Sequence, residues 1–364
     1  MKQSRLLSRL DAEIAGSSDT ITLHCLRIER ACYLARRGEI DEARATVVEF
    51  RKRYQQEPNV VISTWLSLAE GMLIHFSDMG QQARDKFHRA NALSAAAGLS
   101  QMNALSAAWL AHMDYLAANM TGMSRFARQA LQLAEPSNHS ALSRANLVIA
   151  LAYHLAGRLD LAKAWYAKTH LHATAEGDDA TMSALLHNIA WLRAANMRQE
   201  TLSGRVVSPS GEHALSGVES TLQFDSFVGT TSLQALSPIL LALIHTTEGK
   251  FSEGLAGYQA YLPSAIEQGM ARMHANLLAD QAWCRINLGQ TQAARIDALA
   301  AEKLVDPKGH LDDRAATHSR LAQVFEILGE SETSAKHHEM AKAAWDGHCN
   351  LQQHIIEVLD GIRP

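Results

Sequence analysis

The chain has 364 residues, 47% of them hydrophobic and 6% aromatic, with a formal net charge of −4 at pH 7. This slightly acidic balance argues against general affinity for nucleic acid, which needs a strongly basic face. Four cysteines without a CxxC pair are too few for a disulfide framework, which favours a reducing, cytoplasmic location. The longest apolar run, Ile239 to Ile244, is far too short to cross a bilayer, so we expect no membrane association.

Residues 1–16 predict a short amphipathic helix with leucines on one side, at Leu6, Leu7 and Leu10. Asp19 is the expected N-cap of the next helix. Alanine and leucine are abundant along the rest of the chain and β-branched runs are rare, which favours helix over sheet.

A pair of amphipathic helical patterns then recurs about every 40 residues. In its best-defined copy, small Gly71 lies on the first helix, and Ala83, Phe87 and Ala90 lie on the second. The residues matching Ala83 in the other copies are Ala43, Ala127, Ala162, Gly254, Ala294 and Ser334. Small side chains let two helix axes approach closely, while aromatic residues such as Tyr258 fill the wider gaps beside them. The pattern predicts about eight antiparallel helix pairs.

Glycines separate the two helices of most pairs, where a left-handed backbone ends the first helix. They are Gly38, Gly122, Gly157, Gly249, Gly289 and Gly329. We interpret the basic pair Arg36–Arg37 as part of a solvated helix surface. The acidic pairs Asp178–Asp179 and Asp312–Asp313 begin helices, where carboxylates favour the positive end of the helix dipole.

Two segments depart from the repeat. Ala162 and Gly254 are 92 residues apart, 12 more than two periods of 40, so one further repeat with an insertion is expected between them. Residues 199–211, rich in Ser, Gly and Pro, predict this inserted loop within the fifth repeat. Residues 349–361 predict a C-terminal helix that caps the open end of the stack.

The recurring small and aromatic positions of these helix pairs resemble the pattern of the tetratricopeptide-repeat superfamily. With a period near 40 rather than 34, they are similar to its longer-helix branch, as in the helical arms of MalT-type transcriptional activators. The resemblance covers nearly the whole chain and implies one all-α, right-handed superhelical solenoid over residues 1–364. The sequence departs from the strict consensus in lacking Trp at position 4 of the repeat, which makes the shorter-period, peptide-clamp subfamilies a poorer match.

The resemblance also implies which side chains face the concave groove of such a superhelix. These are Trp65, His75, Trp109, His112, Asn119, Arg144, His154, His187, Trp191, Asn276 and Trp283. Aromatic anchors beside hydrogen-bond donors suit a peptide groove. The alternative is that each tryptophan packs between adjacent first helices as core. The 199–211 loop is a second candidate surface, or a plain flexible insertion.

Neither catalysis nor metal binding is indicated. No HxxxH or HExxH pattern occurs, and adjacent His337 and His338 point to different faces of a helix, so we expect no metal and no cofactor. The sequence favours a non-catalytic scaffold that binds a protein or peptide in the groove. The alternative is a ligand-sensing regulator whose superhelix changes pitch when a small molecule or short peptide binds. The partner's identity and self-association through an end face stay open.

Overall fold

The structure is a computed structural model that describes residues 4–78, 80, 82–203, 211–229 and 236–363. These residues form seventeen α-helices and one short 3-10 helix, and no β-strand occurs among them. The all-α prediction is confirmed. Helix α1 precedes eight successive pairs, α2/α3 to α16/α17.

The helices of the first four pairs, with α1, are Arg5–Gly16 (α1), Thr20–Arg37 (α2), Ile40–Arg53 (α3), Val60–Asp78 (α4), Gln82–Ala96 (α5), Ser100–Leu116 (α6), Met120–Leu133 (α7), His139–Leu155 (α8) and Leu159–Glu176 (α9). The remaining helices are Asp179–Leu202 (α10), Gly211–Val228 (α11), Leu236–Thr247 (α12), Phe251–Glu267 (α13), the 3-10 helix Met270–Met273, His274–Asn287 (α14), Thr291–Leu304 (α15), Leu311–Ile327 (α16) and Ser331–Leu359 (α17).

The chain divides into two compact units. Unit 1 comprises Met1–Leu185, Gln223–Ser232 and Ile355–Pro364, and unit 2 comprises Leu186–Leu222 and Leu233–His354. Helices α10, α11 and α17 contribute residues to both units. A single right-handed solenoid over residues 1–364 stays a prediction, whereas the helix pairs are seen directly within each unit.

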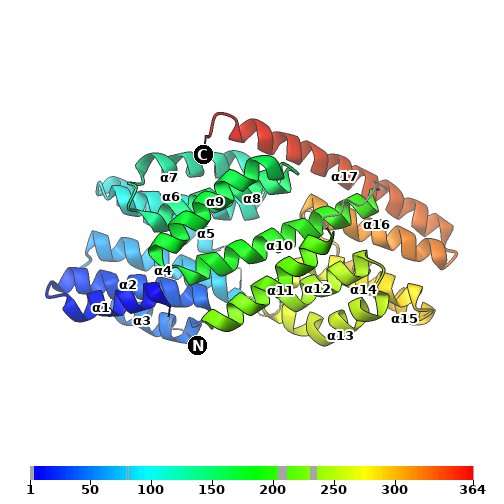
Figure 1. The fold of residues 1–364 in the computed structure, drawn as a ribbon, viewed down its shortest axis with the longest axis horizontal. Coiled ribbons are helices and arrows are strands. Elements are labelled where there is room, and N and C mark those ends of the chain that lie inside the picture. Colours follow the sequence, from blue (N-terminus) through cyan, green and yellow to red (C-terminus); the bar gives the residue numbers. More distant parts are fainter. Residues whose placement is uncertain (1–3, 79, 81, 204–210, 230–235, 364) are drawn as a thin grey trace. The chain divides into compact units, whose positions relative to one another are not determined.

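Unit 1 contains the pairs α2/α3, α4/α5, α6/α7 and α8/α9 (Figure 1). First helices also pack on one another, α2 against α4 and α6 against α8. The predicted alanines of the second helices, Ala43, Ala83, Ala127 and Ala162, are all fully buried. A Cβ atom on Gly71 would lie 2.7 Å from Phe87 Cε1, which is closer than side chains approach one another. Small residues therefore set the spacing of each pair, as predicted.

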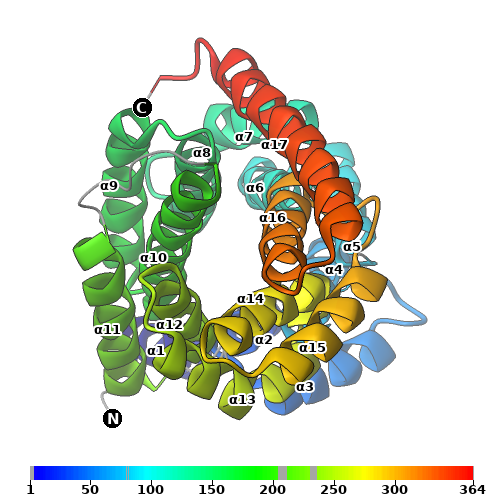
Figure 2. The same ribbon diagram turned by 90° about the vertical axis from the view of Figure 1, so that its right-hand side faces the viewer.

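Unit 2 repeats this packing. Figure 2 shows α14 and α16 in an inner layer, with α13, α15 and α17 outside them. Ala294, Tyr258 and Phe325 are fully buried. A Cβ atom on Gly254 would lie 2.6 Å from Thr246 Oγ1, so α13 approaches α12 too closely for a larger residue.

Most of the predicted turn glycines adopt a left-handed backbone, among them Gly157 with a φ of 72°. The prediction for Gly122 is wrong. It lies within α7, where a Cβ atom would collide with the Asp114 carboxylate, and Ala118 takes the left-handed position with a φ of 55°. Asn119 caps α7 by accepting a hydrogen bond from the Gly122 amide at 3.2 Å. This glycine serves close packing rather than chain reversal.

Arg36 and Arg37 are not solvated surface, contrary to the sequence prediction. The Arg36 guanidinium donates to Asp178 Oδ2 at 2.6 Å, and side-chain exposure is 11% for Arg36 and 0% for Asp178. Asp178 also caps α10 by accepting from the Thr181 amide at 2.9 Å. Nearby, the Leu6 amide of α1 donates to the Gly177 carbonyl at 3.2 Å. Helices α1 and α2 thus contact the turn that joins α9 to α10.

The predicted loop at residues 199–211 begins later than expected, because α10 continues to Leu202. The Gln199–Leu202 segment contains no glycine or proline, and Thr201 Oγ1 donates to the Met197 carbonyl within the helix at 2.9 Å. Residues 204–210 of the predicted loop lie outside the described residues, and so do the side chains of residues 211–214.

The predicted capping helix at residues 349–361 is not a separate helix, because its residues continue α17 to Leu359. This helix contains no proline and one glycine, Gly347. A Cβ atom on Gly347 would lie 3.2 Å from Leu311 Cδ2, so the glycine allows close packing there. Ile355 and Leu359 are fully buried, as expected for a cap. They belong to unit 1, where the Val358 carbonyl accepts from Ser124 Oγ at 2.5 Å. The Leu359 carbonyl accepts from the Tyr153 hydroxyl of α8 at 3.3 Å. The end of α17 therefore contacts α7 and α8.

One helix, α4, is long and apolar enough at residues 60–77 to meet the criteria for a membrane span. Of that window, 56% is buried within the fold, where α4 packs against α2 and α5.

Candidate functional site

Polar and aromatic side chains of the first helices gather into two groups, one in each unit. We name the group in unit 1 the Trp109 cluster; it consists of His75 from α4, Trp109 and His112 from α6, and Arg144 from α8. We name the group in unit 2 the Asp280 network; it consists of Arg198 from α10, Asn276, Asp280 and Trp283 from α14, and Arg320 from α16.

The Trp109 cluster is built from rings packed edge to face. The His75 ring centroid lies 6.1 Å from that of Trp109 and 5.4 Å from that of His112. The opposite face of the cluster rests on the core, because Trp109 stacks on Phe87 with centroids 5.3 Å apart. The Arg144 guanidinium carbon lies 4.1 Å from the Trp109 ring centroid, within range of a cation–π contact.

Burial sets the charge of these groups. It lowers the pKa of His75 to about 4, with a smaller effect of the nearby Arg144 charge. Burial also takes the pKa of His112 well below its ordinary value. Both histidines are therefore neutral at pH 7. Burial and then the charge of Arg36 lower the pKa of Arg144 to about 9, which still leaves a cation at neutral pH.

Two polar atoms of the Trp109 cluster are fully enclosed without a hydrogen-bond partner, His112 Nδ1 and Arg144 Nε. Most buried polar groups in folded proteins are hydrogen-bonded, and an orphaned one costs about 1–3 kcal/mol. The cluster therefore contains unused hydrogen-bonding capacity beside its aromatic rings.

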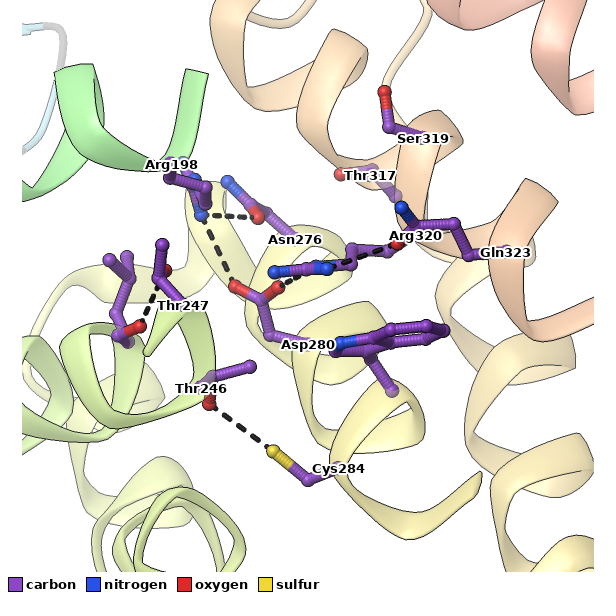
Figure 3. A network of polar contacts seen from close by, with 12 residues as sticks. Arg198, Thr246, Thr247, Asn276, Asp280, Cys284, Thr317, Ser319, Arg320 and Gln323 are labelled. Carbon is purple, nitrogen blue, oxygen red and sulfur yellow. Dashed lines mark hydrogen bonds and ion pairs between the residues drawn. The ribbon is translucent and has the colours of Figure 1, made fainter. Parts of the chain in front are cut away.

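The Asp280 network is, by contrast, held together by ion pairs and hydrogen bonds, although Arg320 Nη2 is enclosed without a hydrogen-bond partner. Asp280 Oδ1 accepts from Arg320 Nε at 2.9 Å, and its Oδ2 lies 3.3 Å from Arg198 Nη1 (Figure 3). Arg198 also donates to Asn276 Oδ1 at 2.8 Å, and Arg320 donates to Gln323 Oε1 at 3.0 Å. The side chains of Asp280, Arg198 and Arg320 are at most 4% exposed. The network joins α10, α14 and α16 of unit 2.

A small pocket lies beside Asn276, with a volume of about 20 Å³, enough for roughly one water molecule. Arg272, His310 and Asp313 contribute to its lining. Among the described residues, no group of three or more His, Cys, Asp or Glu side chains comes together as a metal site requires. The arrangement in both units suits recognition by hydrogen bonds and aromatic packing.

The structure brings six of the eleven predicted groove residues into these two groups. They are His75, Trp109, His112 and Arg144 in unit 1, and Asn276 and Trp283 in unit 2. Trp109 is only 1% exposed, so for this residue the core interpretation describes its packing. His187 is buried in unit 2, which lowers its pKa to about 4, and half-buried Trp191 packs against two clusters of core residues. Trp65 is half-buried on α4.

Two predicted groove residues lie elsewhere. Asn119 is exposed and caps α7, because α6 ends before it at Leu116. His154 faces its own second helix, where its Nδ1 lies 2.9 Å from the Tyr166 hydroxyl. The pattern of positions along each first helix fails at the helix ends, where the chain turns.

The sequence reasoning missed Arg198, Asp280 and Arg320. A signal was present, because Asp280 follows Asn276 by four residues and shares its helix face. Arg320 lies 40 residues after Asp280, which is one repeat period, so the two residues occupy equivalent positions on adjacent first helices. Opposite charges at equivalent positions of neighbouring repeats are a searchable pattern.

Comparison with known proteins bears on the fold. No family model matches the sequence, and no curated protein sequence matches it. Solved structures do match: a Rap protein complexed with competence and sporulation factor has a TM-score of 0.50 and 13% sequence identity, and the match covers 92% of this chain and 99% of that chain. At this identity the likeness concerns the fold. Together with the helix pairs described above, it identifies an all-α helical-repeat fold of the tetratricopeptide-like kind.

Proposed function

We propose that this chain is a non-catalytic scaffold that binds a peptide, or an extended segment of a protein, on the first helices of unit 1. The observation that carries the proposal is the Trp109 cluster, which brings together aromatic rings and unused polar atoms from three consecutive repeats. A peptide needs such a combination, since aromatic anchors supply contact area and a few donors fix its orientation.

The comparison supports the same proposal. The Rap protein that shares this fold was crystallised with a bound factor, so a fold of this kind can hold a partner molecule. We further propose a cytoplasmic location and a place among the longer-period, MalT-type repeat arms, because Gly249, Gly289 and Gly329 recur every 40 residues.

A binding selection tests the proposal. The full chain is incubated with a pool of random ten-residue synthetic peptides, and the retained peptides are identified by mass spectrometry. We expect a related set of peptides to be retained. The double variant His75→Phe with His112→Phe keeps two rings in place but removes their nitrogen atoms, so it should lose this set. The control is His88→Phe on α5, a half-buried histidine whose ring packs near Phe126 outside the cluster.

Retention of the same peptides by the double variant, or of none by the wild-type chain, would contradict peptide binding on unit 1. The alternative function, a ligand-sensing regulator, predicts instead that no peptide is retained while a small-molecule metabolite raises the melting temperature. Turnover of any peptide or metabolite during incubation would contradict both.

A further inference from the structure

Arg144 is a buried cation without a carboxylate partner. The residue is 5% exposed, and among the described residues it donates no hydrogen bond and forms no ion pair. Within the part of the chain that the structure describes, its one direct electrostatic contact is with the face of the Trp109 ring. A buried charge left unpaired is strongly destabilising, so folded proteins rarely keep one without a use for it.

The surroundings of Arg144 do not neutralise it. Neighbouring His75 and His112 carry no charge at pH 7, and an imidazole supplies no negative charge in either protonation state. The acidic group whose charge acts on the pKa of Arg144 is Asp178, which already accepts hydrogen bonds from Arg36 and from the Thr181 amide and hydroxyl. With Arg36 and Asp178 cancelling, one positive charge remains in this part of unit 1.

Three other arginines with little exposed side chain each form an ion pair with a carboxylate. Arg198 and Arg320 each contact Asp280 at 3.3 and 2.9 Å, and Arg36 contacts Asp178 at 2.6 Å. Arg144 thus stands out from three arginines that have a carboxylate within 4 Å. The Nε atom of Arg144 is fully enclosed and has no hydrogen-bond partner. The two terminal nitrogens also make no hydrogen bond among the described residues, but they are not fully enclosed. They therefore keep some contact with solvent.

We propose that Arg144 is the anchor for a carboxylate of the bound peptide, with Trp109 as the aromatic platform beside it. The planar guanidinium fork matches the two oxygens of a carboxylate, and the contact with the face of the indole ring, at 4.1 Å, holds the fork in place. This inference rests on the proposed function and narrows its ligands to peptides that carry a free C-terminal carboxylate or an acidic side chain.

Four pools of random ten-residue peptides separate the two sources of carboxylate. One pool has free C-termini and contains Asp and Glu. The second has free C-termini without acidic residues, the third has amidated C-termini with Asp and Glu, and the fourth is amidated and free of acidic residues. We expect wild-type protein to retain peptides from the first pool and none from the fourth. Retention from the second identifies a C-terminal carboxylate, and retention from the third identifies an acidic side chain.

Variants of Arg144 tie retention to this residue. Arg144→Met should weaken binding of a retained peptide by roughly 10-fold or more, since a charge-assisted bond is lost. Arg144→Lys keeps the charge without the fork and should bind with intermediate affinity. Without peptide, Arg144→Met should leave the melting temperature unchanged or raise it. The matched control Arg320→Met removes one of two arginines that contact Asp280 and should lower it.

Equal retention from the first and fourth pools, or unchanged affinity in Arg144→Met, would overturn the carboxylate anchor while leaving peptide binding intact. A fall in the melting temperature of Arg144→Met equal to that of Arg320→Met would also overturn it, since Arg144 would then be a structural residue. Retention from no pool would remove the proposed function together with this inference.

Discussion

Arg320 and Asp280 form an ion pair with 2.9 Å between Nε and Oδ1, and the two residues are one 40-residue period apart. They occupy equivalent positions on adjacent first helices, α14 and α16, so the repeat itself brings them together. Arg198 from α10 lies on the other carboxylate oxygen at 3.3 Å. One buried carboxylate thus links three first helices of unit 2.

Removing the Asp280 carboxylate should lower the free energy of unfolding of unit 2. We predict that Asp280→Ala destabilises unit 2 by about 3–5 kcal/mol, because it leaves Arg198 and Arg320 buried without a counter-charge. The control is Arg295→Ala, which breaks an exposed ion pair with Glu330 and should cost at most about 1 kcal/mol. Urea denaturation followed by circular dichroism measures both. Equal midpoints for the two variants would show that the network contributes no more than a surface pair.

A second prediction concerns the spacing of the helix pairs. Ala162 is fully buried on α9, so Ala162→Leu should overpack the α8/α9 pair by about 1–3 kcal/mol. Ala164 is exposed on the same helix, and Ala164→Leu provides the same change of residue without the crowding. Thermal melting curves of the two variants are the measurement. A melting temperature unaffected by Ala162→Leu would refute the close approach of these helices.

A third prediction concerns Trp109. Trp109→Ala should destabilise unit 1 by about 3–5 kcal/mol, since the indole is 1% exposed and stacks on Phe87. Trp65→Ala, at a half-buried tryptophan, should cost less. Chemical denaturation of each variant decides the matter. If the two variants lose the same free energy of unfolding, Trp109 is not part of the core. Loss of peptide binding in Trp109→Ala would then test the groove directly.

The fourth prediction is a pH dependence. Burial, and then the charge of Glu176, raise the pKa of Glu29 from 4.5 to about 7. Arg9 and Arg36 lower it, while Glu13 raises it further. The folded state therefore binds a proton that the unfolded state has released above pH 4.5. This contribution to stability is complete below about pH 4.5 and is lost as the pH rises to about 7.

Glu29→Gln should accordingly remove part of the fall in melting temperature between pH 4.5 and pH 7. The control Glu57→Gln changes an exposed carboxylate after α3 and should leave the profile as in the wild type. The measurement is the melting temperature at half-unit steps of pH. Parallel profiles for wild type and Glu29→Gln would mean that Glu29 carries no such linkage.

Much of the fold follows from the sequence because it depends on side-chain size at a fixed period. Gly71 beside Phe87 and the buried Ala162 are local consequences of two helices packing closely, and such contacts are written into each repeat. The end of α17 was predicted less well. Ile355 and Leu359 are buried as expected, but the contact of neighbouring Val358 with Ser124 of α7 joins residues 234 positions apart, which no periodic pattern encodes.

The candidate site was predicted in part for a related reason. Position along a first helix identified His75, His112 and Arg144, since it determines which face a side chain occupies. It did not identify Arg198 and Arg320, because their shared partner Asp280 lies 82 and 40 positions away in the sequence. From sequence alone, a charged residue is interpreted as solvent-exposed unless the partner of its ion pair is known.

We propose that a peptide binds to the first helices of unit 1 at the Trp109 cluster. Hydrogen–deuterium exchange of the full chain, with and without a peptide retained in the selection, tests it most directly. Binding there should slow exchange in α4, α6 and α8, and should leave the second helices α3, α5 and α7 unchanged. Protection confined to those second helices, or to unit 2, would contradict the account.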